Sequence, residues 1–208
     1  MPKEADPGEA ELHRADLASD PLEQFRSWFV EAEAAVEVPE AMALATATPD
    51  AAPSVRMVLL KGADERGLVF YSHHTSRKGR ELEANPQAAL LFHWRPLGRQ
   101  VRVEGRVEHV SSEESDGYFA TRQRDAQLGA AASRQSEPLG SREELYERIE
   151  GLDRDLDGGS VPRPPTWGGF RLVPAAWEFW QHRANRLHDR FRYEREPSRA
   201  WTVERLYP

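Results

Sequence analysis

The alternation of apolar and polar residues is clearest between residues 99 and 110. Val101, Val103 and Val107 fall on one side of this segment, and the residues between them are mostly polar or charged. Because successive side chains of a strand point to opposite faces, the pattern predicts a β-strand with one buried face. Four other apolar segments bounded by turn residues predict strands over 42–48, 54–61, 68–73 and 88–94. Short strands joined by tight turns are typical of an antiparallel barrel.

Helical spacing begins after Asp20, which suits an N-cap and is followed by Pro21 at the first helical position. The apolar stripe of this helix consists of Leu22, Phe25, Phe29, Ala32 and Val36. Serine caps predict three more helices: from Thr75-Ser76 to Asn85, from Ser111 to about Arg122, and from Ser141 onward. Residues 158–165 are expected to form a loop, and a last hairpin is expected to turn near 196–198.

Residues 1–19 are polar and without periodicity, which predicts a flexible N-terminal arm. We find no internal repeat in the rest of the chain and no sign of a second domain. Residues 20–208 are therefore expected to form one domain, mainly β with helices (α+β).

The amino-acid composition excludes several kinds of site and ligand. The 208 residues include no cysteine, which excludes disulfides, thiolate nucleophiles and cysteine-ligated metals. No apolar run approaches the length of a membrane span and no signal peptide is visible, so we expect a soluble cytoplasmic protein with no membrane contact. A net charge of −7 argues against nonspecific nucleic-acid binding. His73 and His74 would point apart on a strand, so we expect no metal.

Two segments bring cations next to strands. In 56–61, Arg56 and Lys61 stand at the two ends of an apolar strand, expected to be buried on both faces, with the cations on opposite faces. The second segment joins Tyr71-Ser72 to Ser76-Arg77-Lys78, where a strand runs into a helix start. Free backbone N–H groups and the helix dipole favour an anion there, so this is a candidate phosphate site. The alternatives are strand ends that reach solvent and an ordinary basic helix start.

A third group lies on and after the helix expected from Ser111. Tyr118 and Arg122 are four residues apart and share a helix face, where a phenol and a guanidinium could hold a second phosphate. The segment Ser133-Arg134-Gln135-Ser136 follows and adds further hydrogen-bonding side chains. A solvated helix face is the alternative.

The C-terminal segment 178–190 has the highest density of functional side chains in the sequence. On an extended strand Arg186, His188 and Arg190 would share one face, while Leu187 and Asp189 would point to the other. Three cationic or protonatable groups side by side favour an anionic or electron-rich ligand. The alternative is an edge strand whose charges prevent aggregation.

Together these segments resemble the FMN-dependent pyridoxine (pyridoxamine) 5′-phosphate oxidases, over nearly the whole chain from about Asp16. The resemblance rests on segments 56–61, 70–71, 76–78, 99–101, 127–130, 133–136, 167–170, 178–181 and 186–190. It implies an FMN-binding split β-barrel, a homodimer with FMN at the subunit interface, and oxidation of a phosphorylated B6 vitamer by O2 to pyridoxal 5′-phosphate and hydrogen peroxide.

The resemblance also implies roles for single residues. Those that would hold FMN are Arg56, Met57, Val58, Leu59, Leu60, Lys61, Tyr71, Ser72, Arg77, Lys78, Gln100, Gln135, Ser136, Trp180 and Arg190. Arg56, Arg77 and Lys78 would bind its phosphate. The substrate phosphate would be bound by Lys61, Tyr118 and Arg122, and Arg186 and His188 would be the catalytic pair beside the substrate ring.

Several positions depart from the family pattern. Residues 1–19 contain no tyrosine, although the family commonly has an Arg-x-x-Tyr element in its arm. Ala126 replaces a serine usual among the substrate-phosphate ligands, Gln123 stands where proline is common, and His182 and Arg183 occupy a small, glycine-rich spacer. The alternatives are therefore a split-barrel FMN oxidase of another substrate, such as a phenazine-biosynthesis-type oxidase, or a non-catalytic flavin or B6-phosphate binder. The sequence sets neither vitamer preference, rates nor pathway.

Overall fold

The computed structural model describes residues 11–196, 198 and 200–208. The α-helices of this part are α1 (Pro21–Ala35), α2 (Arg77–Ala84), α3 (Ser112–Thr121), α4 (Arg124–Ala132) and α5 (Arg142–Leu156). Single 3₁₀ turns occur at Arg14–Asp16, Arg95–Leu97 and Ala184–Arg186. The strands are β1 (Ala41–Ala47), β2 (Pro53–Leu59), β3 (Gly62–Asp64), β4 (Gly67–His73), β5 (Gln87–Trp94), β6 (Arg99–His109), β7 (Trp167–Gln181), β8 (Asp189–Arg195) and β9 (Trp201–Arg205).

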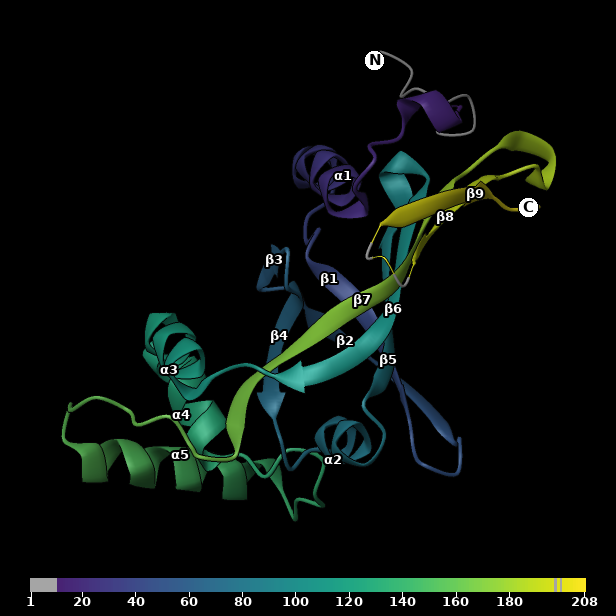
Figure 1. The fold of residues 1–208 in the computed structure, drawn as a ribbon. Helices are drawn as coiled ribbons and strands as arrows, with labels where there is room; N and C mark the ends of the chain where they lie inside the picture. Colours follow the sequence, from purple (N-terminus) through teal and green to yellow (C-terminus); the bar gives the residue numbers. More distant parts are fainter. Residues whose placement is uncertain (1–10, 197, 199) are drawn as a thin grey trace.

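All strands of the described chain pair antiparallel in one curled sheet, in the order β2-β1-β5-β6-β7-β4-β3. The long strand β7 organises it (Figure 1). One edge of β7 pairs with β6 over 170–181, whereas the other pairs with β4 over 167–172 and with β8 over 176–181. The sheet therefore divides at the middle of β7, next to Pro174, which has no N–H for a partner strand. This confirms the predicted mainly antiparallel α+β barrel.

The core fills the inside of this sheet and is closed by α1. Phe25 of α1 packs against Phe92 and Trp177 with ring centroids 5.1 and 5.5 Å apart, and Trp28 meets Phe179 edge to face at 5.2 Å. Asp20 caps α1 by accepting a hydrogen bond from the Leu22 N–H at 2.7 Å. The predicted N-cap is confirmed, and aromatic contacts fix the helix on the barrel.

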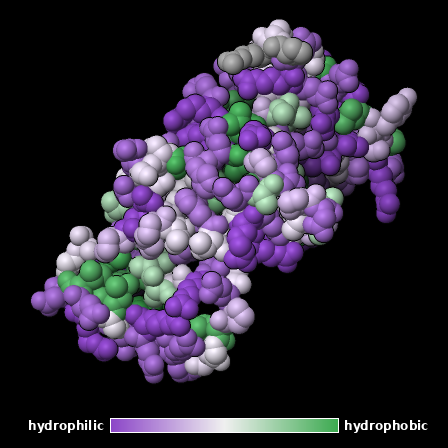
Figure 2. All heavy atoms as spheres, turned by 60° about the horizontal axis from the view of Figure 1, so that its bottom comes forward, coloured by the Kyte–Doolittle hydropathy of each residue, from purple (hydrophilic) through white to green (hydrophobic). Residues whose placement is uncertain are grey.

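Helices α3, α4 and α5 form a lobe with its own small core of Phe119, Leu128, Ala130, Val161 and Trp167. Figure 1 shows this lobe at one end of the molecule, with α1 and the β8–β9 hairpin at the other. The face seen in Figure 2 is mostly hydrophilic, with apolar side chains gathered at the end that carries the lobe. The lobe forms one wall of the cleft described below.

The predicted helix starts at Ser76, Ser111 and Ser141 are confirmed, since each serine accepts a backbone hydrogen bond at the start of its helix. The strand predictions are also confirmed to within a residue or two at each end. The expectation that segment 56–61 is buried on both faces is wrong. In β2 the side chains of Met57 and Leu59 are 64% and 41% exposed, because β2 is an edge strand that, among the described residues, pairs only with β1.

The predicted strand face of Arg186, His188 and Arg190 is also wrong. Strand β8 begins at Asp189, so only Arg190 of the three lies on it. Asn185 and Arg186 have φ of 58° and 62°, which places both in the left-handed region and turns the chain before the strand. Leu187 is exposed and Asp189 is buried, so the expected alternation fails at the turn.

Part of the predicted N-terminal arm, residues 1–10, lies outside the described residues. After it, Leu12 and Leu17 are buried and the Leu12 N–H donates to Asp189 Oδ2 at 3.2 Å. The Tyr193 hydroxyl donates to the carbonyl of Ala18 at 2.7 Å. This stretch therefore contacts the β8–β9 hairpin, and the division of the chain at residue 19 stays a prediction. None of the helices in the described ranges is long and apolar enough to cross a membrane.

Candidate functional site

A cleft of about 870 Å³ lies between the lobe and the open edge of the barrel. Its walls come from β2, the end of β4, the start of α2, α3, α4 and the segment after α4. The residues that line it are Ser54, Val55, Arg56, Met57, Val58, Leu59, Lys61, Tyr71, Ser72, His73, Arg77, Lys78, Tyr118, Arg122, Ala126, Gly129, Ala130, Ser133, Gln135, Ser136 and Trp167. Most of the residues predicted to bind phosphate or flavin thus share one cavity.

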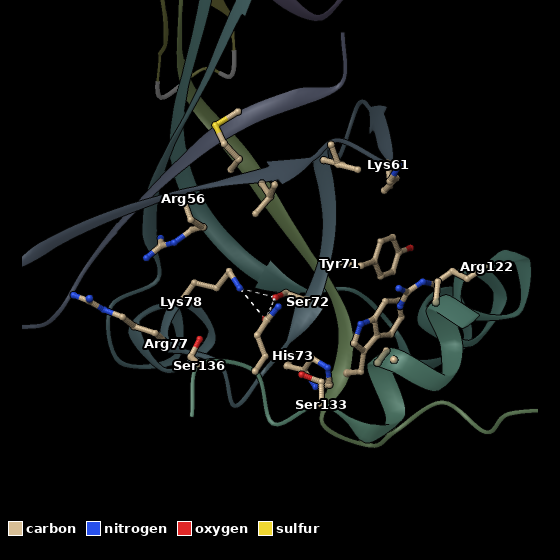
Figure 3. A pocket seen from close by; sticks show the side chains of 18 of the residues that line it. Arg56, Lys61, Tyr71, Ser72, His73, Arg77, Lys78, Arg122, Ser133 and Ser136 are labelled. Carbon is tan, nitrogen blue, oxygen red and sulfur yellow. Dashed lines mark hydrogen bonds between the residues drawn. The ribbon is translucent and has the colours of Figure 1, made fainter. Parts of the chain in front are cut away.

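Lys78 lies at the centre of one side of the cleft and is 8% exposed. Its ammonium donates to Ser72 Oγ and Gln135 Oε1, both at 2.9 Å (Figure 3). The Ser72 hydroxyl donates to the same Gln135 oxygen at 2.9 Å. Helix α2 approaches the end of β4 closely, because a Cβ on Gly79 would lie 2.0 Å from the His74 carbonyl oxygen. The glycine therefore allows Lys78 to sit against the strand.

Burial of the Lys78 ammonium, together with the nearby Arg56 charge, lowers the pKa of Lys78 to about 8. Desolvation disfavours the charged form of an amine, and a neighbouring guanidinium adds repulsion. A bound anion would reverse both effects. This side of the cleft is thus suited to a group with negative charge.

Arg56 and Arg77 flank Lys78 and share one carboxylate. Arg77 Nε donates to Glu81 Oε1 at 2.9 Å, and Arg56 Nη2 lies 3.3 Å from Glu81 Oε2. Arg56 comes from β2 and Arg77 from the first turn of α2, so two separate elements bring these cations together. They are the cations predicted for a cofactor phosphate.

Other cations stand across the cleft, beside an aromatic wall. Tyr71 stacks on Tyr118 with ring centroids 4.0 Å apart and on Trp167 at 5.4 Å. The Arg122 guanidinium lies over the Trp167 ring at 5.0 Å from its centroid. In Figure 3 Arg122, Lys61 and Tyr71 lie on one side, and Arg56, Arg77 and Lys78 on the other. The cleft therefore has two separate cationic regions.

The prediction that Arg56 and Lys61 face opposite ways is wrong, because segment 56–61 is not one continuous strand. Strand β2 ends at Leu59, and the Lys61 N–H already donates to the Val69 carbonyl of β4 at 2.8 Å. The chain turns between the two cations, and both line the cleft. Leu60 instead points into the core and is 8% exposed.

His73 also lines the cleft. Burial, with the charges of Lys78 and Arg122, lowers the pKa of His73 and keeps the ring neutral near neutral pH. In residues 11–196, 198 and 200–208, no group of three or more histidine, cysteine, aspartate or glutamate side chains is arranged to hold a metal ion.

Besides Leu60, five predicted site residues do not line the cleft: Gln100, Trp180, Arg186, His188 and Arg190. The reason is the length of β7. Trp167 at its start lines the cleft, whereas Trp180 near its end pairs with Gln100 and Arg190 on the neighbouring strands. Thirteen extended residues span about 40 Å. The two groups therefore lie near opposite ends of β7.

This second group forms its own cluster around Trp180. The His188 ring lies 4.4 Å from the Trp180 ring, centroid to centroid, and the Arg183 N–H donates to His188 Nδ1 at 3.1 Å. Partial burial, then the charges of His182, Arg186 and Arg190, lower the pKa of His188. The ring is therefore neutral near neutral pH. Since Nδ1 accepts, Nε2 carries the proton and can donate it to a ligand.

Arg190 is held in place by Glu178, the buried carboxylate of β7. Arg190 Nε donates to Glu178 Oε1 at 2.8 Å, and Arg102 Nη2 donates to the same oxygen at 2.6 Å. The Arg186 guanidinium, by contrast, is exposed and has no hydrogen bond or ion pair within the described part of the chain. Arg186 is thus available to a ligand.

Some cleft residues were not predicted as site residues, namely Ser54, Val55, His73, Gly129, Ala130, Ser133 and Trp167. Trp167 matters most, because it carries both the stack with Tyr71 and the contact with Arg122. The Trp-Gly-Gly-Phe segment was a usable signal. A Cβ on Gly169 would lie 2.8 Å from Tyr71 Cε1, so glycine there lets the Tyr71 ring pack close to β7.

The curled antiparallel sheet and its flanking cleft define the chain as a split-barrel protein. A solved structure described as PhzG from Burkholderia lata 383 in complex with tetrahydrophenazine-1-carboxylic acid superposes with a TM-score of 0.90 and 36% identity, over 97% of this chain and all of that one. A pyridoxamine 5′-phosphate oxidase-related, FMN-binding protein from Nostoc punctiforme has the same fold, with a TM-score of 0.74 and 16% identity over 92% of this chain and 100% of that chain.

The family model described as "Pyridoxamine 5′-phosphate oxidase" matches residues 30–152, and one described as "Pyridoxine 5′-phosphate oxidase C-terminal dimerisation region" matches residues 167–208. The chain belongs to the pyridoxamine 5′-phosphate oxidase family. It is 58% identical to the pyridoxine/pyridoxamine 5′-phosphate oxidase of Rubrobacter xylanophilus, over 95% of this chain and 94% of the relative. It is 55% identical to the protein of that name from Gluconobacter oxydans, over 93% and 96%.

Proposed function

We propose that this protein oxidises pyridoxine 5′-phosphate or pyridoxamine 5′-phosphate to pyridoxal 5′-phosphate, with bound FMN as cofactor and O2 as electron acceptor. The observation that carries the proposal is the cleft with two separate cationic regions, one of them beside an aromatic wall. A phosphorylated cofactor and a phosphorylated substrate each need such a region. The identity to relatives named pyridoxine/pyridoxamine 5′-phosphate oxidase supports this choice of substrate.

FMN fits the region around Lys78. Arg56, Arg77 and Lys78 would bind its phosphate, and the exposed edge of β2 with Tyr71, Ser72, Gln135 and Ser136 would line the rest. The donors there outnumber the acceptors, which suits a phosphate monoester. Bound FMN would supply the redox step, taking a hydride from the substrate and passing electrons to O2 to give hydrogen peroxide.

The substrate phosphate would lie across the cleft, bound by Lys61, Tyr118 and Arg122. Burial raises the pKa of Tyr118, so its phenol stays protonated and can donate. The Arg122 guanidinium over Trp167 is held by the ring face and still presents its N–H edge. These contacts would orient the substrate ring toward the flavin.

We further propose that two chains complete each site as a homodimer. The partner's copy of the cluster around Trp180 would then cover the cleft of the first chain and bring in Gln100, Arg186, His188 and Arg190. Three features support this: the span of β7, the exposed apolar residues Val55 and Met57 on β2, and the match of residues 167–208 to a dimerisation region. Arg186 and the His188 Nε2–H would then face the substrate ring as the catalytic pair.

The test is the flavin content and peroxide yield of the purified protein. We expect a yellow protein with about one FMN per chain, and hydrogen peroxide release when pyridoxine 5′-phosphate is added. Arg56→Ala should weaken FMN binding by roughly 10- to 100-fold, because it removes a charge-assisted contact to phosphate. An unchanged FMN affinity in this variant would remove Arg56 from the site.

A second candidate is an oxidase of another planar substrate. It is favoured by Ala126 in the cleft wall and by the likeness to PhzG, whose solved complex contains a tetrahydrophenazine carboxylic acid. A phosphate dianion would use both Lys61 and Arg122, whereas the single negative charge of a carboxylate is matched by one of them. Faster flavin reduction by a tetrahydrophenazine carboxylic acid than by both B6 phosphates would replace the first proposal. Flavin without peroxide from either substrate would indicate a binder without catalysis.

A further inference from the structure

One carboxylate buried behind the wall of the cleft is not accounted for by the proposed binding of FMN. Glu81, on α2, is 5% exposed and is surrounded by donors. Its Oε2 accepts from Thr46 Oγ1 at 2.5 Å and from Ser54 Oγ at 2.6 Å, and its Oε1 accepts from Arg77 Nε. Burial alone would raise the pKa of Glu81. These hydrogen bonds and the Arg56 charge outweigh burial and lower the pKa of Glu81 to about 2. Glu81 is therefore a fixed negative charge.

The two hydroxyls connect Glu81 to Arg56. Arg56 Nη1 donates to Thr46 Oγ1 at 2.5 Å, and Arg56 Nη2 donates to Ser54 Oγ. A guanidinium can only donate and a carboxylate can only accept. Each hydroxyl must therefore accept a hydrogen bond from Arg56 and donate one to Glu81. The direction of every hydrogen bond in this network is fixed by its two ends.

The network joins separate parts of the fold. Glu81 lies one helical turn after Arg77 on α2, Thr46 is on β1, and Ser54 and Arg56 are on β2. Figure 3 shows Arg56 entering the cleft from a strand and Arg77 from the helix. Among the described residues, Glu81 is the one carboxylate that forms ion pairs with both Arg56 of β2 and Arg77 of α2.

We propose that Glu81 is a positioning residue that sets the spacing of Arg56 and Arg77, and thereby makes this side of the cleft selective for the phosphate monoester of a flavin. The inference rests on the proposed function. Three cations and one carboxylate leave a net charge of about +2 around the position of the phosphate, which matches a dianion. Without the carboxylate, the two guanidiniums would repel each other and separate.

A simple charge effect would have the opposite sign. Glu81 is an anion close to the proposed phosphate, so replacing it with a neutral side chain should tighten FMN binding if charge alone matters. If Glu81 positions the guanidiniums, the same replacement should weaken binding. Glutamine has one acceptor oxygen, so its NH2 group would face either Arg77 Nε or the two hydroxyls, and in both cases a donor would meet a donor within the network. The sign of the change therefore distinguishes the two explanations.

The experiment is a fluorescence titration of apoprotein with FMN and with riboflavin, which has the same ring and no phosphate. For Glu81→Gln we expect FMN affinity to fall about tenfold or more, with riboflavin affinity changed by less than about twofold. Glu83→Gln is the matched control, since Glu83 lies on the same helix, is exposed and pairs only with His109 among the described residues. It should leave both affinities unchanged.

Unchanged or tighter FMN binding by Glu81→Gln would overturn the inference, and so would an equal loss for FMN and riboflavin, which indicates general damage to the cleft. If Glu81→Gln does not fold, Thr46→Val removes one connecting hydroxyl at nearly constant shape. It should weaken FMN by roughly threefold to tenfold and spare riboflavin, and no loss would overturn the inference. A wild-type protein that binds neither flavin would instead contradict the proposed function.

Discussion

Lys78 illustrates how a single buried side chain can set the pH range in which a site binds an anion. Its ammonium makes hydrogen bonds to Ser72 and Gln135 and is nearly shut off from solvent. Such a group has a pKa of about 8 in the free protein. An anion binds best while the amine is protonated, so the affinity for phosphate falls as pH rises through that value.

We therefore expect FMN affinity to decrease as pH rises from about 7 to about 9, by up to roughly tenfold per pH unit above the pKa. Fluorescence titration across this range checks it. Riboflavin controls for titration of the ring, and Lys78→Met should bind FMN weakly with little dependence on pH. An FMN affinity that is flat over this range would show that Lys78 does not contact the phosphate.

Ala126 is the residue at which the substrate side of the cleft departs from the family pattern. It lines the cleft near Arg122, where the family usually has a serine hydroxyl. We expect Ala126→Ser to lower KM for pyridoxine 5′-phosphate by roughly tenfold, the worth of one hydrogen bond to a charged group, with kcat little changed. Steady-state kinetics check this, with Ala132→Ser on the same helix as control. An unchanged KM would place the substrate phosphate elsewhere.

At the scale of elements, prediction succeeded where one physical signal dominated. Strand β6 follows from alternation, strands β1, β2, β4 and β5 follow from apolar segments between turn residues, and three helices follow from serine caps. Helix α4 was not predicted, because its N-cap Gln123 is not a usual capping residue and its alanines, although good helix formers, give no clear apolar stripe. The turn before β8 depends on positive φ at Asn185 and Arg186, which an alternating pattern does not reveal.

The candidate site shows the same limit. The residue types alone predicted that each candidate site carries positive charge within an acidic chain. The ligands were predicted from the family resemblance. Glu81 was missed because a glutamate in a charged helix normally faces solvent. It is buried here by the packing of α2 on β1 and by its hydrogen bonds to Ser54 and Arg56 of β2. Trp167 was part of a recognised segment, but its contact with Arg122 depends on how the lobe folds back.

The edge strand β2 makes a prediction about assembly. Val55, Met57 and Leu59 are 69%, 64% and 41% exposed in a single chain, which is unusual for three apolar residues on one strand face. Met57→Asp should convert the dimer to a monomer at micromolar concentration and reduce bound flavin. Light scattering and absorbance measure both. Val30→Asp, at an exposed position of α1, is the control. A Met57→Asp dimer with full flavin would remove β2 from the interface.

For the whole molecule, the central feature is that one chain holds two groups of predicted site residues at opposite ends of β7. Arg56 belongs to the group in the cleft, and Arg186 to the group around Trp180. In a homodimer, each site would take one group from each chain.

This arrangement predicts complementation between two defective variants. Arg56→Ala and Arg186→Ala should each have little activity alone. When the two are unfolded together and refolded, or co-expressed, random pairing should restore roughly a quarter of the wild-type sites, because half of the dimers are mixed and each mixed dimer has one intact site. Peroxide release per chain measures the recovery. No recovery despite mixed dimers in native mass spectrometry would mean that both arginines act within one chain.

The length of β7 has a consequence for how the protein behaves in dilute solution. If each site needs both chains, a dissociated chain is not a slower enzyme but an inactive one, and it also loses the surface that retains the cofactor. Turnover per chain should then fall with dilution below the dimer dissociation constant, and added flavin should shift that threshold to lower protein concentration, since a ligand shared by two chains strengthens their association.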